Sequence, residues 1–324
     1  EAFETPEAVA SWSDAGFGGL SANMHRFVNA HIVPKSWRNK LRPILYNDWE
    51  GCMFNFNQRR LLDLADRAKD LGCELFVLDD GWFGKRDNDL AGLGDYNVNL
   101  KKLPDGMAGL AKKIRDKGME FGLWFEPESV NPDSDLYRAH PDWCLHVNGR
   151  ERSEGRCQLV LDMSRTDVRD NIFEQMSSVL DNYDIDYVKW DSNRALTENF
   201  SLGLDADCQQ EFHTRWTLGL YDIFERIINS HPDIFFEGCS SGGARFDAGM
   251  LYYFPQIWTS DDTDAYMRTR IQYGTSLAYP LSALSCHVSI CPNQQTGRTS
   301  PFATRATIAH LGATGYELDT ARML

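Results

Sequence analysis

Short apolar runs alternate with amphipathic segments along most of the 324-residue chain. Runs of strand character lie near residues 45, 76, 122, 187, 235, 257, 284 and 316, and helical spacing of apolar residues covers 55–72, 104–118, 166–183, 211–232, 264–279 and 304–313. Such apolar strands, buried on both faces and separated by helices, are typical of a parallel sheet. Eight units in this length favour a (β/α)8 TIM barrel over a doubly wound sheet. We therefore predict a barrel over residues 41–324, with a lead-in segment over residues 1–40.

Three local features refine this prediction. Gly72 follows the first amphipathic segment and is predicted to end that helix. The run MLYYFPQIWTSD (250–261) is predicted to be extended throughout. The run QLVLDMS (158–164) is an additional strand, which we place in a long excursion between the third and fourth units.

Charge and composition exclude several classes of function. The net charge of -14 argues against nucleic acid or an anionic membrane as a partner. No apolar run approaches the roughly 18 to 20 residues of a membrane span, and the acidic start EAFETPEAVASW lacks the features of a signal peptide. The eight cysteines are scattered without a CxxC pair, which indicates that most of them are free thiols. These features together predict a cytoplasmic protein.

Acidic or polar residues follow six of the eight predicted strands: NDWE, LDDGW, WFEPE, VKWD, FEGCSSGG and WTSDD. In a TIM barrel the carboxyl ends of the strands form the catalytic face. Any single aspartate at such a position is more simply a helix N-cap. Because six units share the pattern, and five of them contain a tryptophan near the acid, we predict a polar pocket walled with indoles.

Glycoside hydrolysis needs two carboxylates, one at the anomeric carbon and one to protonate the leaving oxygen. Asp191, at the end of YVKWD, is the strongest nucleophile candidate. Lys189 lies two residues earlier, on the same face of the strand, where an ammonium favours an ionised carboxylate. The alternative interpretation is a structural Lys–Asp ion pair.

Two other chemistries fit the sequence less well. Asp79–Asp80 and Asp261–Asp262 offer the oxygen ligands that Mg²⁺ or Ca²⁺ prefer, but adjacent strand residues point to opposite faces and rarely chelate one ion. No EF-hand, HExxH or P-loop pattern is present, so we predict no metal and no cofactor. The run CSSGG (239–243) lacks the GxSxG pattern of a serine hydrolase.

The motifs LDDGWF, LWFEPE, YVKWDSNR, FEGCSSGGARFDAGML and WTSDDTDA, in this order, resemble those of the bacterial family 36 glycoside hydrolases, the α-galactosidases. The resemblance runs from about residue 10 to the end of the chain. It implies a (β/α)8 barrel and a retaining double displacement without a metal. Family members carry β domains on both sides of the barrel and form tetramers. We expect this chain to contain the barrel alone, with the parent protein a homo-oligomer.

The resemblance also implies roles for individual residues. Asp191 matches the nucleophile and Asp261 the general acid/base, so Asp191 should be ionised when Asp261 is protonated. The positions that match sugar-binding residues are Trp49, Asp79, Asp80, Trp124, Arg156, Lys189, Cys239 and Gly242. Asp79 and Asp80 match the pair that binds O4 and O6 of galactose. Spacing alone does not choose Asp261 over Asp262; the latter should face away or bond to the backbone.

The remaining site positions carry three further expectations. Trp124, Cys239 and Gly242 match the wall around O2 of the sugar. Asp264 precedes AYMRTR and is predicted to be an N-cap. Ser241 is a departure, because the commonest family form of CSSGG is CSGGG.

The expected activity is exo-hydrolysis of terminal α-galactose from melibiose and raffinose-type oligosaccharides. One alternative is an α-N-acetylgalactosaminidase, although a wall around O2 leaves little room for an acetamido group. A second is a raffinose- or stachyose-type galactosyltransferase, which shares the same two carboxylates. A third, of a different class, is a non-catalytic carbohydrate-binding protein.

Overall fold

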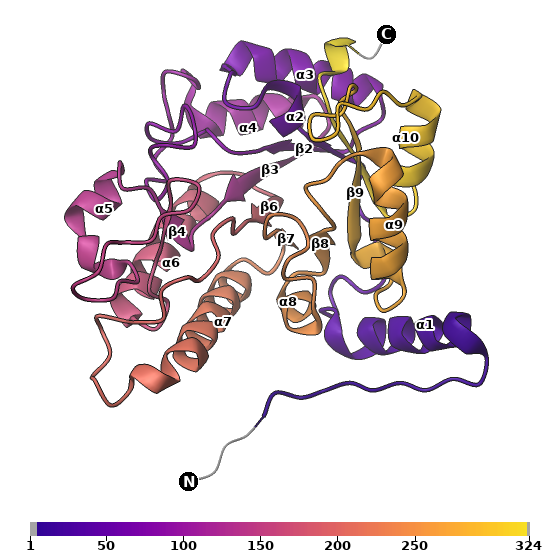
Figure 1. Cartoon of the computed structure of the whole chain (residues 1–324). Helices are drawn as coiled ribbons and strands as arrows, with labels where there is room; N and C mark the ends of the chain where they lie inside the picture. Colours follow the sequence, from indigo (N-terminus) through magenta and orange to yellow (C-terminus); the bar gives the residue numbers. More distant parts are fainter. Residues whose placement is uncertain (1–4, 323–324) are drawn as a thin grey trace.

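Eight parallel strands close into a barrel in the computed structural model, which describes residues 5–322. The order around the barrel is β1-β10-β9-β8-β7-β6-β3-β2. The barrel strands are β1 (Leu45–Asn47), β2 (Leu75–Leu78), β3 (Glu120–Phe125), β6 (Tyr187–Trp190), β7 (Phe235–Gly238), β8 (Gln256–Trp258), β9 (Leu284–Ser289) and β10 (Ala313–Glu317). All eight predicted strands are present, and the TIM-barrel prediction is confirmed (Figure 1).

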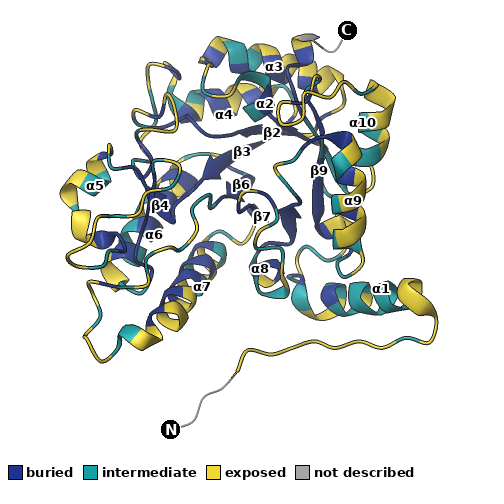
Figure 2. Cartoon of the chain, in the orientation of Figure 1, coloured by how far each residue is buried: buried dark blue, intermediate teal, exposed yellow. Residues whose placement is uncertain are grey.

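Helices form the outer layer, and most of them have buried residues on the side of the barrel and exposed residues on the solvent side (Figure 2). They are α2 (Trp49–Cys52), α3 (Gln58–Asp70), α4 (Gly106–Asp116), α5 (Asp135–Ala139), α6 (Thr166–Asn182), α7 (Phe212–Ser230), α8 (Ala248–Tyr253), α9 (Ala265–Ser276) and α10 (Phe302–Ala309). Single 3-10 turns cover Pro141–Trp143, Gln209–Glu211, Leu281–Ala283 and Thr320–Arg322. In residues 5–322 no helix is both long and apolar enough to cross a membrane.

Local signals explain where these elements begin and end. Gly72 follows α3 with a φ of 85°, a backbone conformation that glycine adopts without strain, so its prediction as the helix end is confirmed. The predicted extended run over 250–261 is wrong in its first half, because residues 250–253 lie in α8. Asp247 caps this helix by accepting from the Met250 backbone N–H at 2.9 Å. The strand itself is limited to β8.

The predicted excursion between the third and fourth units contains a separate two-stranded sheet. Its strands are β4 (Ser129–Val130) and β5 (Leu159–Val160), and they pair antiparallel. The additional strand predicted over 158–164 therefore exists, although it is only two residues long. Most cysteines were predicted to be free thiols, and all eight are.

The lead-in segment has structure that the sequence analysis did not predict. Helix α1 (Gly16–Phe27) continues into a π-helical turn (Val28–Ile32), which packs beside α8. Trp37 then packs edge-on against Phe235, with ring centroids 4.9 Å apart. Phe235 belongs to a cluster of five buried residues, four of which are the first residues of their strands. The amino-terminal end of the barrel is thus filled by apolar side chains, and the polar site lies at the opposite end.

Candidate active site

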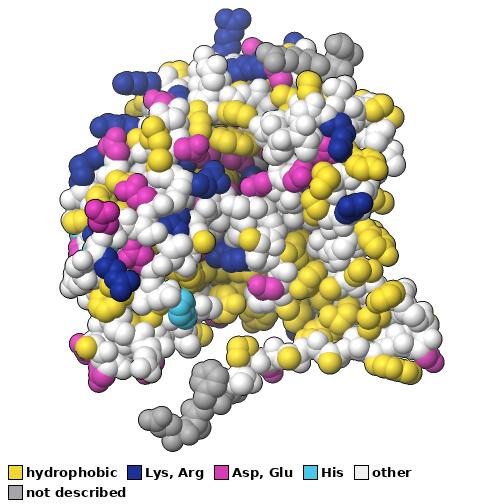
Figure 3. Space-filling view, in the orientation of Figure 1, with side chains coloured by type: hydrophobic (Ala, Val, Ile, Leu, Met, Phe, Trp, Pro, Cys, Tyr) yellow, Lys and Arg dark blue, Asp and Glu magenta, His cyan; other side chains and the backbone are white. Residues whose placement is uncertain are grey.

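A cavity opens at the carboxyl ends of the barrel strands. It is lined by Trp49, Glu50, Asp79, Asp80, Trp124, Glu126, Arg156, Lys189, Asp191, Asn193, Trp258, Asp261, Thr263, Gln294, Gln295 and Glu317. Figure 3 shows acidic and basic side chains gathered around a hollow in this face. The cavity volume is about 140 Å³, and a cavity of roughly 150 Å³ is known to hold one benzene ring. The space therefore suits a single sugar ring.

Asp191 directly follows β6 and is held by three N–H donors. The backbone N–H of Ser192 donates to Oδ1 at 2.8 Å, the Asn193 amide donates to Oδ2 at 2.8 Å, and the Trp124 indole donates to Oδ2 at 3.2 Å. The thiol of Cys239 lies against the same carboxylate, and burial raises the pKa of this thiol well above its usual value. Asp191 is therefore fixed in orientation, with its charge matched by donors.

Asp261 lies in the same cavity, three residues after the end of β8. Its Oδ1 accepts a hydrogen bond from the Trp258 indole at 2.9 Å. Burial, and after it the charge of Asp191, raises the pKa of Asp261 above its ordinary value. A carboxyl with a raised pKa beside a second carboxyl is the pattern expected of an acid and a nucleophile.

Asp79 and Asp80 follow β2 and have different partners. Lys189 donates to Asp79 Oδ2 at 2.8 Å, and the Asn47 amide donates to the same oxygen at 2.6 Å. We expected Lys189 to act mainly on Asp191, but its direct ion pair is with Asp79. The structural Lys–Asp pair considered as an alternative therefore exists, with a different aspartate. Burial opposes the charge on Lys189, yet its acidic neighbours, led by Asp79, raise the pKa of Lys189 well above its usual value.

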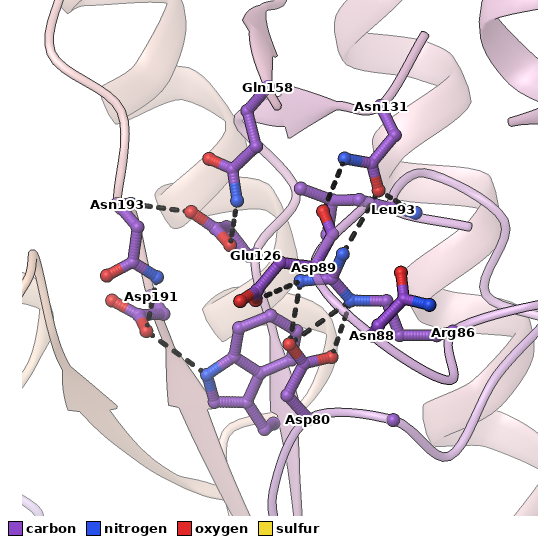
Figure 4. A network of polar contacts seen from close by, with 12 residues as sticks. Asp80, Arg86, Asn88, Asp89, Leu93, Glu126, Asn131, Gln158, Asp191 and Asn193 are labelled. Atoms are coloured by element: carbon purple, nitrogen blue, oxygen red, sulfur yellow. Dashed lines mark hydrogen bonds and ion pairs between the residues drawn. The ribbon is translucent and has the colours of Figure 1, made fainter. Parts of the chain in front are cut away.

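Asp80 is paired with Arg86, a residue that the sequence analysis did not single out (Figure 4). Arg86 Nε and Nη2 donate to the carboxylate at 2.9 and 2.7 Å, and the guanidinium is 1% exposed. Arg86 Nη1 also donates to Asn131 at 3.0 Å, and Asn131 in turn donates to the carbonyl of Cys157 at 2.7 Å. One buried network thus connects Asp80 with the turn that carries Arg156.

Glu126 is a third buried carboxyl in contact with this region (Figure 4). It accepts from the backbone N–H of Asn193 at 2.5 Å and from the Gln158 amide at 3.0 Å. Burial, followed by the charge of Asp191, raises the pKa of Glu126 to about 8. Burial likewise raises the pKa of Glu317 to about 8 and that of Glu50 to about 7. At neutral pH, therefore, not all of the carboxyl groups in the cavity are ionised.

Cys239 and Gly242 support the cavity from behind, although neither lines it directly. Gly242 has a φ of 87°, and a Cβ at this position would lie 2.6 Å from the backbone N of Asp261. Only glycine permits this approach. Ser241 has a φ of 45°, in the left-handed region that glycine adopts most easily, which explains why glycine suits this position. The Ser241 hydroxyl donates to the Asn193 side-chain oxygen at 3.0 Å.

The three aspartates of SDDTDA separate as predicted. Asp262 accepts from the backbone N–H of Asp264 at 3.1 Å, so it bonds to the backbone. Asp264 caps α9 by accepting from Tyr266 and Met267, which confirms its N-cap role. No group of three or more metal-ligating side chains occurs within the described part of the chain.

The sequence profile of the melibiase family matches residues 2–324. The chain belongs to the melibiase family. It is 53% identical over 323 residues to α-galactosidase AgaA of Geobacillus stearothermophilus and 49% identical to α-galactosidase Mel36A of Lactobacillus acidophilus. Both alignments cover 100% of this chain and 44% of the relative. The resemblance to the family 36 enzymes is thus confirmed.

Solved structures of the family share the same fold. The crystal structure of AgaA superposes with a TM-score of 0.95 at 52% identity, covering 96% of this chain and 44% of that one. Variants of AgaA have been solved in complex with raffinose and with stachyose. The chain spans less than half the length of these melibiases.

The structure brings together eight of the ten predicted site residues at the cavity surface, and Cys239 and Gly242 lie directly behind it. Eight further residues line the cavity without a role predicted from the sequence: Glu50, Glu126, Asn193, Trp258, Thr263, Gln294, Gln295 and Glu317. Glu50, Glu126 and Trp258 belong to the strand-end motifs and carried a signal in the sequence. Gln294 and Gln295 lie in the loop after β9, where the sequence has no periodic pattern.

Proposed function

We propose that the protein is a retaining exo-α-galactosidase that removes terminal α-linked galactose from melibiose and raffinose-type oligosaccharides. The observation that carries the proposal is that Asp191 and Asp261 line one cavity of single-ring size, together with Asp79, Asp80 and Lys189. Family membership supports the same conclusion. The raffinose and stachyose complexes of AgaA support the choice of substrate class.

In the proposed mechanism Asp191 attacks the anomeric carbon while Asp261 gives its proton to the leaving oxygen. A covalent galactosyl-enzyme forms, and Asp261 then accepts a proton from the water that hydrolyses it. Three donors fix Asp191, which supports its role as nucleophile. The raised pKa of Asp261 supports its role as acid.

Recognition of galactose rests on charged groups that can accept from or donate to ring hydroxyls. We assign Asp79 and Asp80 to O4 and O6, and Lys189 and Arg156 to further ring hydroxyls. Hydrogen bonds to charged groups are short and strong. A 4-epimer would leave buried carboxylates without partners, which makes such a site selective. We assign Trp49 and Trp124 to the cavity wall, and Cys239 and Gly242 to the structure that closes it near O2.

Kinetics with p-nitrophenyl α-galactoside and its 2-acetamido analogue test the proposal. We expect hydrolysis of the galactoside alone, with α-galactose as the first product by NMR. First formation of the β-anomer would contradict retention. Activity on the acetamido analogue would favour an N-acetylgalactosaminidase, and a trisaccharide formed from sucrose as acceptor would favour a transferase. Binding of galactose without activity on either compound would favour a carbohydrate-binding protein. We also propose that the whole protein assembles as a homotetramer, which light scattering tests.

A further inference from the structure

Trp258 connects the Asp261 carboxyl at the cavity surface to the buried core of the barrel. It is the last residue of β8 and is 3% exposed, whereas Asp261 lines the cavity. The indole N–H donates to Asp261 Oδ1 at 2.9 Å. Within residues 5–322 no second donor reaches this carboxylate. The Gln295 amide donates to the backbone carbonyl of Asp261 at 2.7 Å and not to its carboxylate.

The tryptophan ring is itself held by charged and aromatic neighbours. The guanidinium of Arg268 lies 4.3 Å from the ring centroid, and the imidazole of His287 lies 4.4 Å from it. Arg268 is 3% exposed and donates to the backbone carbonyls of Asp262 and Ser260. Contacts of a cation with the face of an indole stabilise such packing. The packing of Arg268 and His287 therefore fixes the orientation of the indole that donates to Asp261.

Asp191 provides a comparison within the same site. It also accepts from an indole, that of Trp124, but Ser192 and Asn193 donate to it as well. Loss of the Trp124 N–H would leave Asp191 with two N–H donors, those of Ser192 and Asn193. Loss of the Trp258 N–H would leave Asp261 with none, so its carboxyl would rotate freely about its χ angles.

We propose that Trp258 is a positioning residue that holds the Asp261 carboxyl in the orientation needed to protonate the glycosidic oxygen. The inference rests on the proposed acid/base role of Asp261. General acid catalysis requires the proton donor within hydrogen-bond reach of the oxygen it protonates. A single hydrogen bond from a rigid ring supplies that alignment.

The charged and titratable groups around Asp261 set the direction of a pH effect. They are Asp191, Lys189, Arg156, Cys239, Glu317 and Arg268. Burial and then Asp191 raise the pKa of Asp261, while Lys189, the Trp258 hydrogen bond and Arg156 lower it. Removal of the indole N–H should therefore raise the pKa of Asp261 further. A general acid with a higher pKa keeps its proton to higher pH, so the basic limb of the rate profile should move upward.

Trp258→Phe tests the proposal, because it removes the N–H and keeps an aromatic ring against Arg268. The measurement is kcat/KM on aryl α-galactosides whose leaving groups range from dinitrophenyl to phenyl, and on melibiose. Poor leaving groups need the proton, so we expect a loss of roughly 10- to 100-fold for these. We expect little change for the dinitrophenyl substrate, and a basic limb at higher pH.

Trp216→Phe is the matched control. It removes another indole N–H from a protein acceptor, the bond to the Leu161 carbonyl at 3.0 Å, and neither residue lines the cavity. This variant should keep the leaving-group dependence and pH profile of the parent. A Trp258→Phe variant that loses activity equally on all leaving groups, or whose basic limb does not move, overturns the proposal.

Asp261→Ala separates this inference from the function on which it rests. If Asp261→Ala loses activity selectively on poor leaving groups and Trp258→Phe does not, only the positioning role is wrong. If Asp261→Ala shows no leaving-group dependence, or the parent protein has no galactosidase activity, the proposed function and the positioning role are both wrong.

Discussion

Glu126→Gln should make the unfolding free energy less dependent on pH between pH 6 and pH 9. In the folded protein burial, and then the charge of Asp191, raises the pKa of Glu126 from 4.5 to about 8. The unfolded chain releases this proton near its ordinary pKa. The stability from the raised pKa is fully present below about pH 4.5 and is lost as the pH rises through about 8.

The size of the effect follows from the same two pKa values. One unit of pKa corresponds to about 1.4 kcal/mol. Integrated from pH 6 to pH 9, the shift gives a loss of roughly 2 to 3 kcal/mol for the parent protein. Glutamine has no proton to release. Its oxygen can accept from the Asn193 N–H. Its NH2 can donate to Gln158 Oε1 once the Gln158 amide, whose NH2 faces Glu126, turns over.

Urea unfolding at pH 6, 7, 8 and 9 measures the difference. The parent should lose about 2 to 3 kcal/mol more than Glu126→Gln over this range. Glu174→Gln is the control, since Glu174 is exposed on α6 and should follow the parent. Parallel stability curves for the parent and Glu126→Gln would show that Glu126 is already ionised at pH 6, and the reasoning from burial would be refuted.

Three further predictions concern the site. Asp191→Ala should abolish turnover, and azide should restore part of it with β-galactosyl azide as product by NMR; lack of rescue would leave the nucleophile unsupported. Gly242→Ala should lower the unfolding free energy by roughly 2 to 4 kcal/mol, because its Cβ would lie 2.6 Å from the backbone N of Asp261; an unchanged melting temperature would refute this. Arg86→Gln removes the two guanidinium donors of the buried Asp80 and should lower the unfolding free energy by roughly 3 to 5 kcal/mol. Calorimetry should also show weaker galactose binding. A galactose affinity equal to that of the unsubstituted protein would mean that Arg86 has no part in recognition.

Much of the fold could be predicted because most barrel strands are buried on both faces. Burial on both faces requires an apolar run, and the surrounding helices need one apolar stripe each, so both patterns are visible in the sequence. The run over 250–253 was misassigned because its tyrosines favour strands intrinsically, whereas the cap at Asp247 starts a helix. Helix α1 buries no residue, so no apolar stripe marks it.

Only part of the site could be predicted from the sequence, for a different physical reason. Strand-end acids converge because parallel strands end at one edge of the barrel, which makes Asp79, Asp191 and Asp261 predictable as a group. Hydrogen-bond partners depend on loop paths that spacing does not encode. The pairing of Lys189 with Asp79, and of Arg86 with Asp80, became visible only when β2 and β6 were placed in the barrel.

The indoles around the cavity also give the protein a built-in optical reporter. Trp49, Trp124 and Trp258 line the cavity, among nine tryptophans in the chain. A sugar that displaces water from this space changes the polarity around three fluorophores at once. Intrinsic emission should therefore follow ligand binding without a label, including in variants such as Asp191→Ala that bind substrate and do not turn it over.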